Sequence, residues 1–145
     1  MSCGDFYSTR VPSRISCIGT VVEEFLTSLQ NNFGLINELT LFEIKVILNE
    51  VLLNAVRHGN GEDEQKLVKV RAEVNRAGKM ILVVEDEGTG YNYDDVCRCQ
   101  KPCCGEEDPM EISEHGRGII IIKGLSDKVE INERGNRIVI SKSIF

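Results

Sequence analysis

Residues 49–59 read NEVLLNAVRHG, and this stretch decides how the rest of the chain is interpreted. Through it and the residues before it, apolar side chains recur at steps of three and four: Leu41, Ile44, Leu48, Val51 and Ala55. That spacing predicts an amphipathic helix. We expect Thr40 to be its N-cap, with Glu43 completing a capping box, and Gly59 and Gly61 to end it.

The same helix carries a polar stripe. Glu50 and Asn54 are four residues apart and Arg57 follows three residues later, so all three fall on one side. A carboxylate, an amide oxygen and a guanidinium suit a metal-bound phosphate, because Mg²⁺ prefers oxygen ligands and Arg pairs with phosphate oxygens. Taken alone, such a stripe is more commonly a solvated helix face.

The segment before this helix predicts a strand followed by another helix. Residues 6–12 fit an edge strand that ends at Pro12, and Ser13 then fits an N-cap. The helix should run to Phe33, with Gly34 as its terminator. Its apolar stripe consists of Ile15, Ile18, Val22, Phe25 and Leu29.

The segment after it predicts strands. Residues 66–76 alternate strictly, with Val68, Val70, Ala72 and Val74 on one side, as in a half-exposed strand. Ala77-Gly78 makes a turn into the apolar run at 80–84, which fits a central strand. A helix at 118–125 and a hairpin of 128–133 with 137–143 complete the pattern.

The order β-α-α-β-β-loop-α-β-β indicates an α/β (α+β) fold: a two-layer sandwich with helices on one face of a mixed, mostly antiparallel sheet. The 145 residues fit one domain, 1–145, with a long loop at about 91–115. With 17 basic and 23 acidic residues the formal net charge is −6, which argues against a nucleic-acid or anionic-membrane partner. No apolar run reaches membrane-spanning length and no signal peptide is evident, so we expect a cytoplasmic location.

Two glycine-containing motifs follow in the chain. Asp86-Glu87-Gly88-Thr89-Gly90 comes directly after the apolar strand, where a polar side chain at the sheet's end can bind a ligand. Gly116-Arg117-Gly118 opens the predicted third helix, whose free N–H groups favour an anion. Each motif alone also fits an ordinary turn or helix cap.

The combination is more specific than its parts. A helix with E-x-x-x-N, then D-x-G-x-G after a central strand, then G-x-G before a helix resembles the ATP-binding fold of the GHKL superfamily, or Bergerat fold, shared by DNA gyrase, histidine kinases and MutL. The fuller strings, NEVLLNAVRHG at 49–59, VEDEGTG at 84–90 and EHGRGIIIIKGLSDKVEI at 114–131, resemble the anti-sigma factor serine kinases over nearly the whole chain.

This resemblance implies roles for the site residues. It makes Glu50 the general base toward a substrate serine and Asn54 the Mg²⁺ ligand. It implies that Asp86 forms a hydrogen bond with the adenine amino group. The residues shaping the pocket or approaching the phosphates would be Gly88, Gly90, Gly116, Gly118 and, by analogy with related kinases, Arg57. In one departure, Asn136 stands where the family often has a threonine near the nucleotide.

The loop at 91–115 becomes the nucleotide lid under this resemblance. It is acidic and holds Cys97, Cys99, Cys103 and Cys104, a spacing that is not one of the usual paired zinc patterns. Free thiols are the preferred interpretation, and we predict no metal there. A zinc or iron–sulfur site, with His115 as a possible ligand, and a redox switch are the alternatives.

The resulting hypothesis is a Mg²⁺- and ATP-dependent serine protein kinase. It would act as an anti-sigma factor, binding a sigma factor and phosphorylating a STAS-type antagonist, and it would form a homodimer as the family does. The alternative is a nucleotide-binding regulatory module without kinase activity. A histidine kinase is disfavoured, because both histidines, His58 and His115, fall within the predicted ATP-binding elements.

Overall fold

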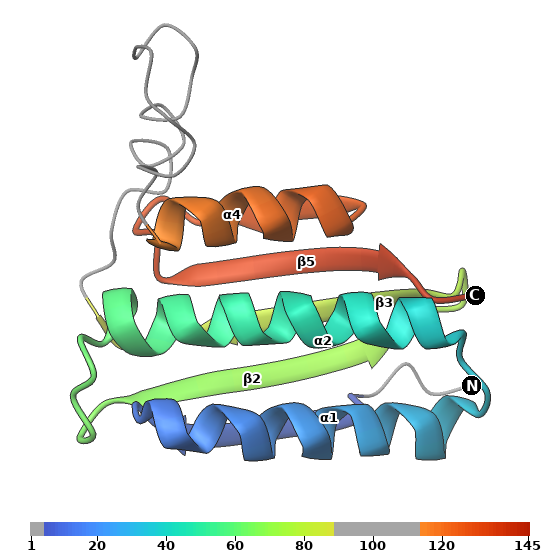
Figure 1. Cartoon of the computed structure of the whole chain (residues 1–145), viewed down its shortest axis with the longest axis horizontal. Helices are drawn as coiled ribbons and strands as arrows, with labels where there is room; N and C mark the ends of the chain where they lie inside the picture. The colour runs from blue at the N-terminus through green and yellow to red at the C-terminus, as the bar shows by residue number, and fades with distance from the viewer. Residues whose placement is uncertain (1–4, 89–113) are drawn as a thin grey trace, which may run out of the picture.

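A computed structural model describes residues 5–88 and 114–145, with side chains from residue 118 onward in the second range (Figure 1). In chain order its elements are β1 (Tyr7–Pro12), η1 (Ile15–Cys17), α1 (Ile18–Phe33), α2 (Glu38–Leu53), η2 (Asn54–Gly59), β2 (Leu67–Val74), β3 (Lys79–Glu85), α4 (Glu114–Leu125), β4 (Lys128–Ile131) and β5 (Arg137–Ser143). The predicted element order is confirmed across these residues.

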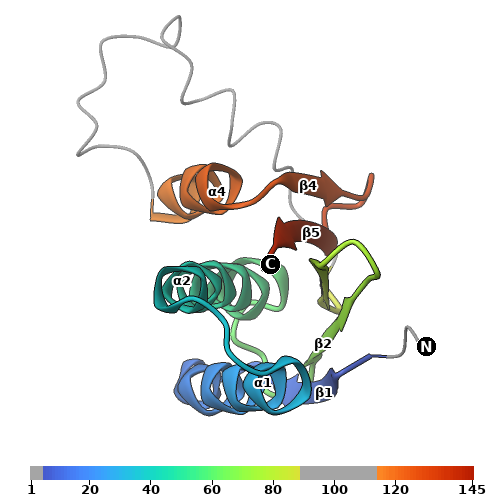
Figure 2. The same cartoon turned by 90° about the vertical axis from the view of Figure 1, so that its right-hand side faces the viewer.

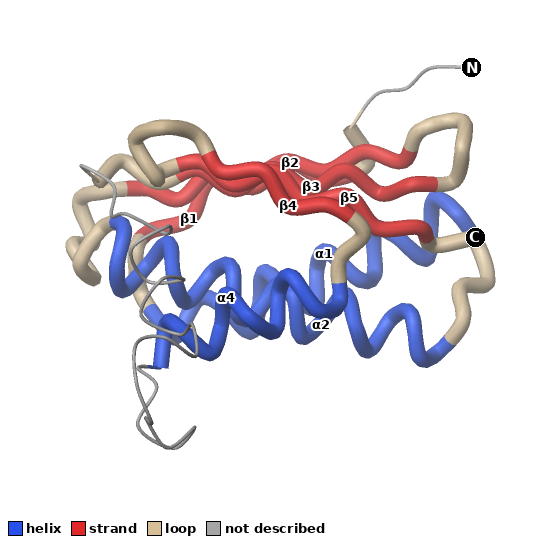
Figure 3. The backbone as a smooth tube through the Cα atoms, turned by 90° about the horizontal axis from the view of Figure 1, so that it is seen from above, coloured by secondary structure: helices blue, strands red, loops and turns tan. Residues whose placement is uncertain are grey.

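The five described strands form one sheet in the order β1-β2-β3-β5-β4. Every strand pair in it is antiparallel, and β3 lies in the centre, as the apolar run at 80–84 predicts. The helices α1, α2 and α4 all lie on one face of the sheet (Figures 2 and 3). The predicted two-layer α/β architecture is therefore confirmed.

The core lies between these two layers and is almost entirely aliphatic. Phe25 and Leu29 of α1, Ile44 and Leu48 of α2, and Ile122 of α4 are fully buried against the sheet. From the sheet come the alternate residues of each strand: Val68, Val70 and Ala72 of β2, and Met80, Leu82 and Val84 of β3. The strict alternation predicted for β2 is confirmed, because its intervening residues face away from the helices.

The beginning of α1 differs from the prediction. A short 3₁₀ turn precedes the α-helix, and Ile15 remains 43% exposed instead of joining the buried stripe. Ser13 is fully buried and caps no helix, because its hydroxyl donates to the Lys66 carbonyl (2.7 Å). The other end of α1 is as predicted, with Gly34 at φ 76° donating its N–H to the Gln30 carbonyl.

The beginning of α2 also differs. Its N-cap is Asn37, three residues before Thr40, and the Asn37 side chain accepts hydrogen bonds from the Leu39 N–H (2.7 Å) and the Thr40 N–H (3.4 Å). Glu43 forms no capping box and instead pairs with the buried ammonium of Lys142 at 3.5 Å. The predicted cap at Thr40 is wrong because Asn37 satisfies these N–H groups first.

Helix α4 begins at Glu114, four residues earlier than predicted. Most of the predicted lid, residues 91–113 with its four cysteines, lies outside the described residues, and so do Thr89 and Gly90. Within the described ranges no helix is long and apolar enough to cross a membrane.

Candidate nucleotide site

Helix α2 does not stop at Leu53 but widens into a π-helical segment, η2, from Asn54 to Gly59. Such segments are rare and occur frequently at functional sites, because the wider turn re-aims side chains. Here the widening begins at Asn54, the predicted metal ligand, and ends at Gly59. Arg57 lies in the same segment and is half-buried.

One cluster forms where the first turns of α4 lie beside the end of α2 (Figures 1 and 2). A Cβ added to Gly118 would lie 2.6 Å from Glu50 Oε2 and 3.6 Å from both Oδ1 and Nδ2 of Asn54. The α4 backbone therefore packs directly against both polar side chains, and the absence of a side chain at residue 118 makes the approach possible. We call Glu50, Asn54 and Gly118 the carboxylate–amide cluster.

Asn54 has a buried polar atom that the described part of the protein does not satisfy. Its side chain is buried, with 3% exposure, and among the described residues its Nδ2 has no hydrogen-bond partner. A buried amide without a partner costs free energy on the order of 1–3 kcal/mol. An incoming phosphate oxygen that accepts a hydrogen bond from Nδ2 would recover that cost. With the Glu50 carboxylate adjacent, the donor set suits Mg²⁺ and phosphate.

A second cluster forms around Asp86, at the end of β3. The Asp86 side chain is 4% exposed, and its Oδ1 accepts a hydrogen bond from the Gly88 N–H at 2.9 Å. A Cβ on Gly59 would overlap the Asp86 carboxylate, and a Cβ on Gly88 would overlap the Gly59 carbonyl. We call Asp86, Gly59 and Gly88 the aspartate cluster.

Burial controls the ionisation of Asp86. Desolvation raises the pKa of its carboxyl to about 6, against the opposing effect of the Gly88 N–H. A carboxyl buried at a strand end with a raised pKa is typical of a ligand-binding site rather than of a packing position.

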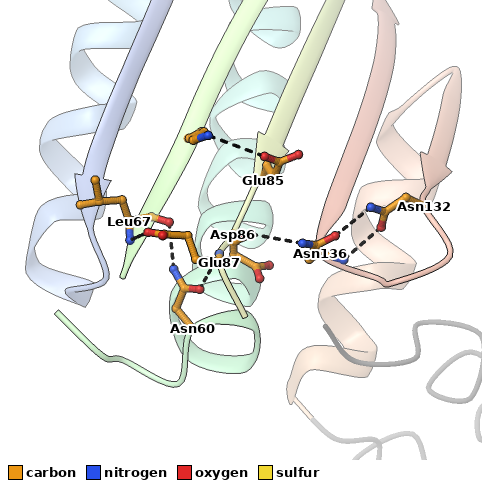
Figure 4. A network of polar contacts seen from close by, with 8 residues as sticks. Asn60, Leu67, Glu85, Asp86, Glu87, Asn132 and Asn136 are labelled. Atoms are coloured by element: carbon orange, nitrogen blue, oxygen red, sulfur yellow. Dashed lines mark hydrogen bonds and ion pairs between the residues drawn. The ribbon is translucent and has the colours of Figure 1, made fainter. Parts of the chain in front are cut away.

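Two asparagines hold the backbone of the aspartate cluster, one on each side (Figure 4). The Asp86 N–H donates to the Asn136 carbonyl (2.9 Å), and Asn136 Nδ2 donates to the Asp86 carbonyl (3.4 Å). On the other side, the Glu87 N–H donates to Asn60 Oδ1 at 2.8 Å. Asn136, which departs from the family pattern, thus contacts the backbone of Asp86.

The predicted site residues are therefore distributed as follows. The structure brings Glu50, Asn54 and Gly118 together, and it brings Asp86 and Gly88 together. Gly116 is the third residue of α4 rather than preceding the helix, so its N–H still belongs to the free group at the helix start. Gly118 is beyond the first four helical residues, whose N–H groups are the free ones, and its contribution is close packing.

Sequence reasoning missed two residues at this site. Gly59 was predicted only as a helix terminator, yet it makes room for the Asp86 carboxylate. Asn60 was not singled out, although it is 3% exposed and holds the Glu87 N–H. The available signal was their position directly after the E-x-x-x-N helix, but the interaction is long-range and no local pattern shows it.

Comparison with known proteins agrees with this geometry. The family model described as "Histidine kinase-like ATPase domain" matches residues 11–142. The chain is 24% identical over 124 residues to "Serine-protein kinase RsbW" of Bacillus subtilis, covering 86% of this chain and 76% of that protein. It is 29% identical over 107 residues to "Anti-sigma F factor" of Priestia megaterium, covering 74% and 67%.

Solved structures support the fold. The histidine kinase domain of the Erythrobacter litoralis EL346 blue-light activated histidine kinase superposes with a TM-score of 0.55 at 18% identity. That alignment covers 99% of this chain and 65% of the other. A second structure of the EL346 kinase gives a TM-score of 0.53 at 19% identity, covering 88% and 42%.

The family resemblance and the prediction of a protein kinase that uses ATP are confirmed by these findings. The matched residues include both clusters and nearly all of the described strands and helices. The chain belongs to the histidine kinase-like ATPase domain family.

Proposed function

We propose that this chain is a Mg²⁺- and ATP-dependent serine protein kinase that acts as an anti-sigma factor. In this proposal it binds a sigma factor and phosphorylates a STAS-type antagonist on serine. The observation that carries the proposal is the carboxylate–amide cluster, in which Asn54 Nδ2, without a hydrogen-bond partner among the described residues, lies beside the Glu50 carboxylate and Gly118. The names of the relatives support the anti-sigma role.

The purine would occupy the aspartate cluster. Asp86 can accept a hydrogen bond from the adenine amino group, because Gly88 supplies only one donor to its carboxylate. Gly59 and Gly88 leave the carboxylate room that any side chain would fill. Gly90 would continue this wall, as the family resemblance implies.

The phosphates would lie over the carboxylate–amide cluster. Asn54 would hold Mg²⁺ through its amide oxygen, and the ion would supply neutralisation of phosphate charge. Gly118 lets the α4 backbone approach closely, and we assign Gly116 and Arg57 to the phosphate side on the family resemblance.

Glu50 would act as the general base. Its carboxylate would accept the proton of the substrate serine hydroxyl as that oxygen attacks the γ-phosphorus, and the bond to ADP would break. Glu50 is one helical turn from Asn54, so the base would sit beside the phosphate being transferred. The proposed lid at about 91–115 would exclude water during transfer.

The remaining parts of the proposal concern the assembly. We propose a homodimer acting in the cytoplasm, where ATP and sigma factors are found, with neither nucleic acid nor membrane as a partner. The net charge of −6 favours basic partner segments over nucleic acid.

The test is a phosphoryl-transfer assay with radiolabelled ATP and a STAS-type antagonist from the same organism. The proposal expects one labelled serine, dependent on Mg²⁺, and retention of a sigma factor by the purified protein. ATP binding without any labelling would instead establish a module that regulates its partner by binding alone.

A further inference from the structure

Asn60 is the first residue after η2 and belongs to no regular element. It is 3% exposed, although asparagine at a loop position is normally solvated. Its backbone N–H donates to the Ala55 carbonyl (2.8 Å), which closes the last turn of the π-helical segment. Its burial therefore places an amide group between η2 and the sheet.

The Asn60 amide joins three segments that are far apart in sequence. Nδ2 donates to Ser13 Oγ (2.8 Å) and to the Leu67 carbonyl (3.1 Å), and Oδ1 accepts from the Glu87 N–H (2.8 Å). Ser13 is itself fully buried and donates onward to the Lys66 carbonyl (2.7 Å). Both ends of the amide are thus satisfied, which fixes its orientation.

The contact with Glu87 matters because Glu87 follows Asp86. Figure 4 shows Asn60 and Asn136 on opposite sides of the Asp86–Glu87 segment. Gly59 leaves space for the Asp86 carboxylate, and the next residue, Asn60, holds the backbone that carries it. The dipeptide Gly59-Asn60 therefore both leaves space for the Asp86 carboxylate and fixes the backbone next to it.

We propose that Asn60 is a positioning residue for purine recognition, acting on the nucleotide through Asp86. This rests on the proposed function, because it requires a purine at the aspartate cluster. A hydrogen bond that distinguishes adenine from guanine depends on the position of the acceptor to within a few tenths of an ångström. Loss of the hydrogen bond between Asn60 and the Glu87 N–H would let the Asp86 carboxylate move away from this position.

The consequence is a split between binding and chemistry. The carboxylate–amide cluster contains Glu50, and no hydrogen bond in the described residues links it to the Asn60 side chain. Asn60→Ala should therefore raise the Kd and the KM for ATP about tenfold, which is about 1.4 kcal/mol. The preference for ATP over GTP should fall by a similar factor, and kcat should stay within about twofold.

Two control variants separate positioning from stability. Asn75→Ala removes an equivalent brace at the opposite end of the β2–β3 hairpin, where Asn75 Oδ1 accepts from the Ala77 and Lys79 N–H groups at 3.0 Å. Ser13→Ala removes one partner of Asn60 and leaves its bond to Glu87 intact. Both variants should lower the free energy of unfolding while leaving the ATP-to-GTP preference within about twofold.

The experiment measures Kd for ATP and GTP by calorimetry, and the unfolding free energy by denaturant titration, for the full chain. Asn60→Ser is measured in parallel, so that failure of the alanine variant to fold leaves the test standing. If wild type fails to bind ATP, the proposed function is wrong. If wild type binds ATP but the Asn60 variants keep its purine preference, or if Asn75→Ala and Ser13→Ala lose it equally, the inference is overturned.

Discussion

The aspartate cluster and the carboxylate–amide cluster differ in how their polar groups are satisfied. At Asp86 the protein supplies the Gly88 N–H to the carboxylate, and Asn60 and Asn136 brace the backbone. At Asn54 the buried Nδ2 has no partner among the described residues. Under the proposed function, the chain would build the purine end in advance and leave the phosphate end to be completed by the ligand.

The two clusters also differ in how glycine is used. In the aspartate cluster, two glycines face each other and a carboxylate, so a side chain at either would meet backbone or a buried carboxyl. In the carboxylate–amide cluster, Gly118 faces the far end of the Glu50 side chain, which can move. We therefore expect the purine end to be rigid and the phosphate end to be adjustable.

The largest effect should come from the carboxylate–amide cluster. Glu50→Gln keeps the size of the side chain but removes the base, so phosphoryl transfer should fall by about 10²–10⁴-fold. The Kd for ATP should change by less than about threefold, because the proposal assigns Mg²⁺ to Asn54 and the purine to Asp86, and both residues are unchanged. Transfer of labelled phosphate and calorimetric ATP binding are the two measurements. If ATP binding and phosphoryl transfer were lost together, Glu50 would be a nucleotide-binding residue and not the general base.

The corresponding change at the purine end should have the opposite profile. Asp86→Asn should weaken ATP binding by roughly 10–100-fold, the value of a hydrogen bond to a charged group. It should also raise the free energy of unfolding at pH 7 to 8, because it removes a buried charge. Calorimetry and denaturant titration test both parts. An unchanged ATP affinity would remove Asp86 from purine recognition.

Gly118→Ala should have a smaller effect, and mainly on the chemistry. The new Cβ would lie 2.6 Å from Glu50 Oε2, so the carboxylate must shift. We expect kcat to fall about tenfold. Alanine favours the helix over glycine by about 1 kcal/mol, so the free energy of unfolding should stay the same or rise. Gly124→Ala in the same helix is the matched control, because its Cβ would meet nothing within 4 Å. Equal kcat losses in both variants would contradict the packing argument.

The pH dependence of ATP affinity should report on the aspartate cluster. The pKa of Asp86, about 6, means that its carboxylate becomes a full acceptor as pH rises from 5 to 7, so ATP affinity should increase several-fold. Over pH 4 to 6 the folded state retains a proton that the unfolded state has lost, so this group's contribution to stability falls as pH rises. Glu85, Lys66 and Arg134 are the charged groups that act on it.

Calorimetric ATP titrations at several pH values, on wild type and Asp86→Asn, test this dependence. The dependence should be absent in the variant. A variant that retains the same slope would assign it to another group.

The sequence predicted the fold well where apolar periodicity extends over a whole element. The alternation of β2, the central position of β3 and the glycine end of α1 all follow from local patterns. It singled out residues that the structure brings together where they occur in compact motifs, as with Glu50 and Asn54, and their roles remain a prediction. Asn60 and the role of Gly59 could not be predicted, because their partners lie 7 to 47 residues away in sequence.

Helix starts were the weakest part of the prediction, because several nearby residues can supply a cap. Thr40 and Glu43 match a capping box, yet Asn37 caps α2 and Glu43 pairs with Lys142. Asn37 and Thr40 are both suitable N-cap residues. Glu43 pairs with Lys142 in the folded protein, so it is not available to complete a capping box with Thr40. Local capping patterns therefore predict that a helix begins, but the predicted first residue can be wrong by about one helical turn.

The smallest predicted effect tests this correction and lies outside both clusters. Asn37→Ala removes the acceptor for the Leu39 and Thr40 N–H groups and should lower the free energy of unfolding by about 1 kcal/mol. Thr40→Ala should change it by less than about 0.5 kcal/mol, because its hydroxyl caps nothing. Neither variant should alter the Kd for ATP, since the start of α2 is at the opposite end from Asn54. A larger loss for Thr40→Ala than for Asn37→Ala would restore the predicted capping box, and a changed ATP affinity in either would mean that the two clusters depend on the whole length of α2.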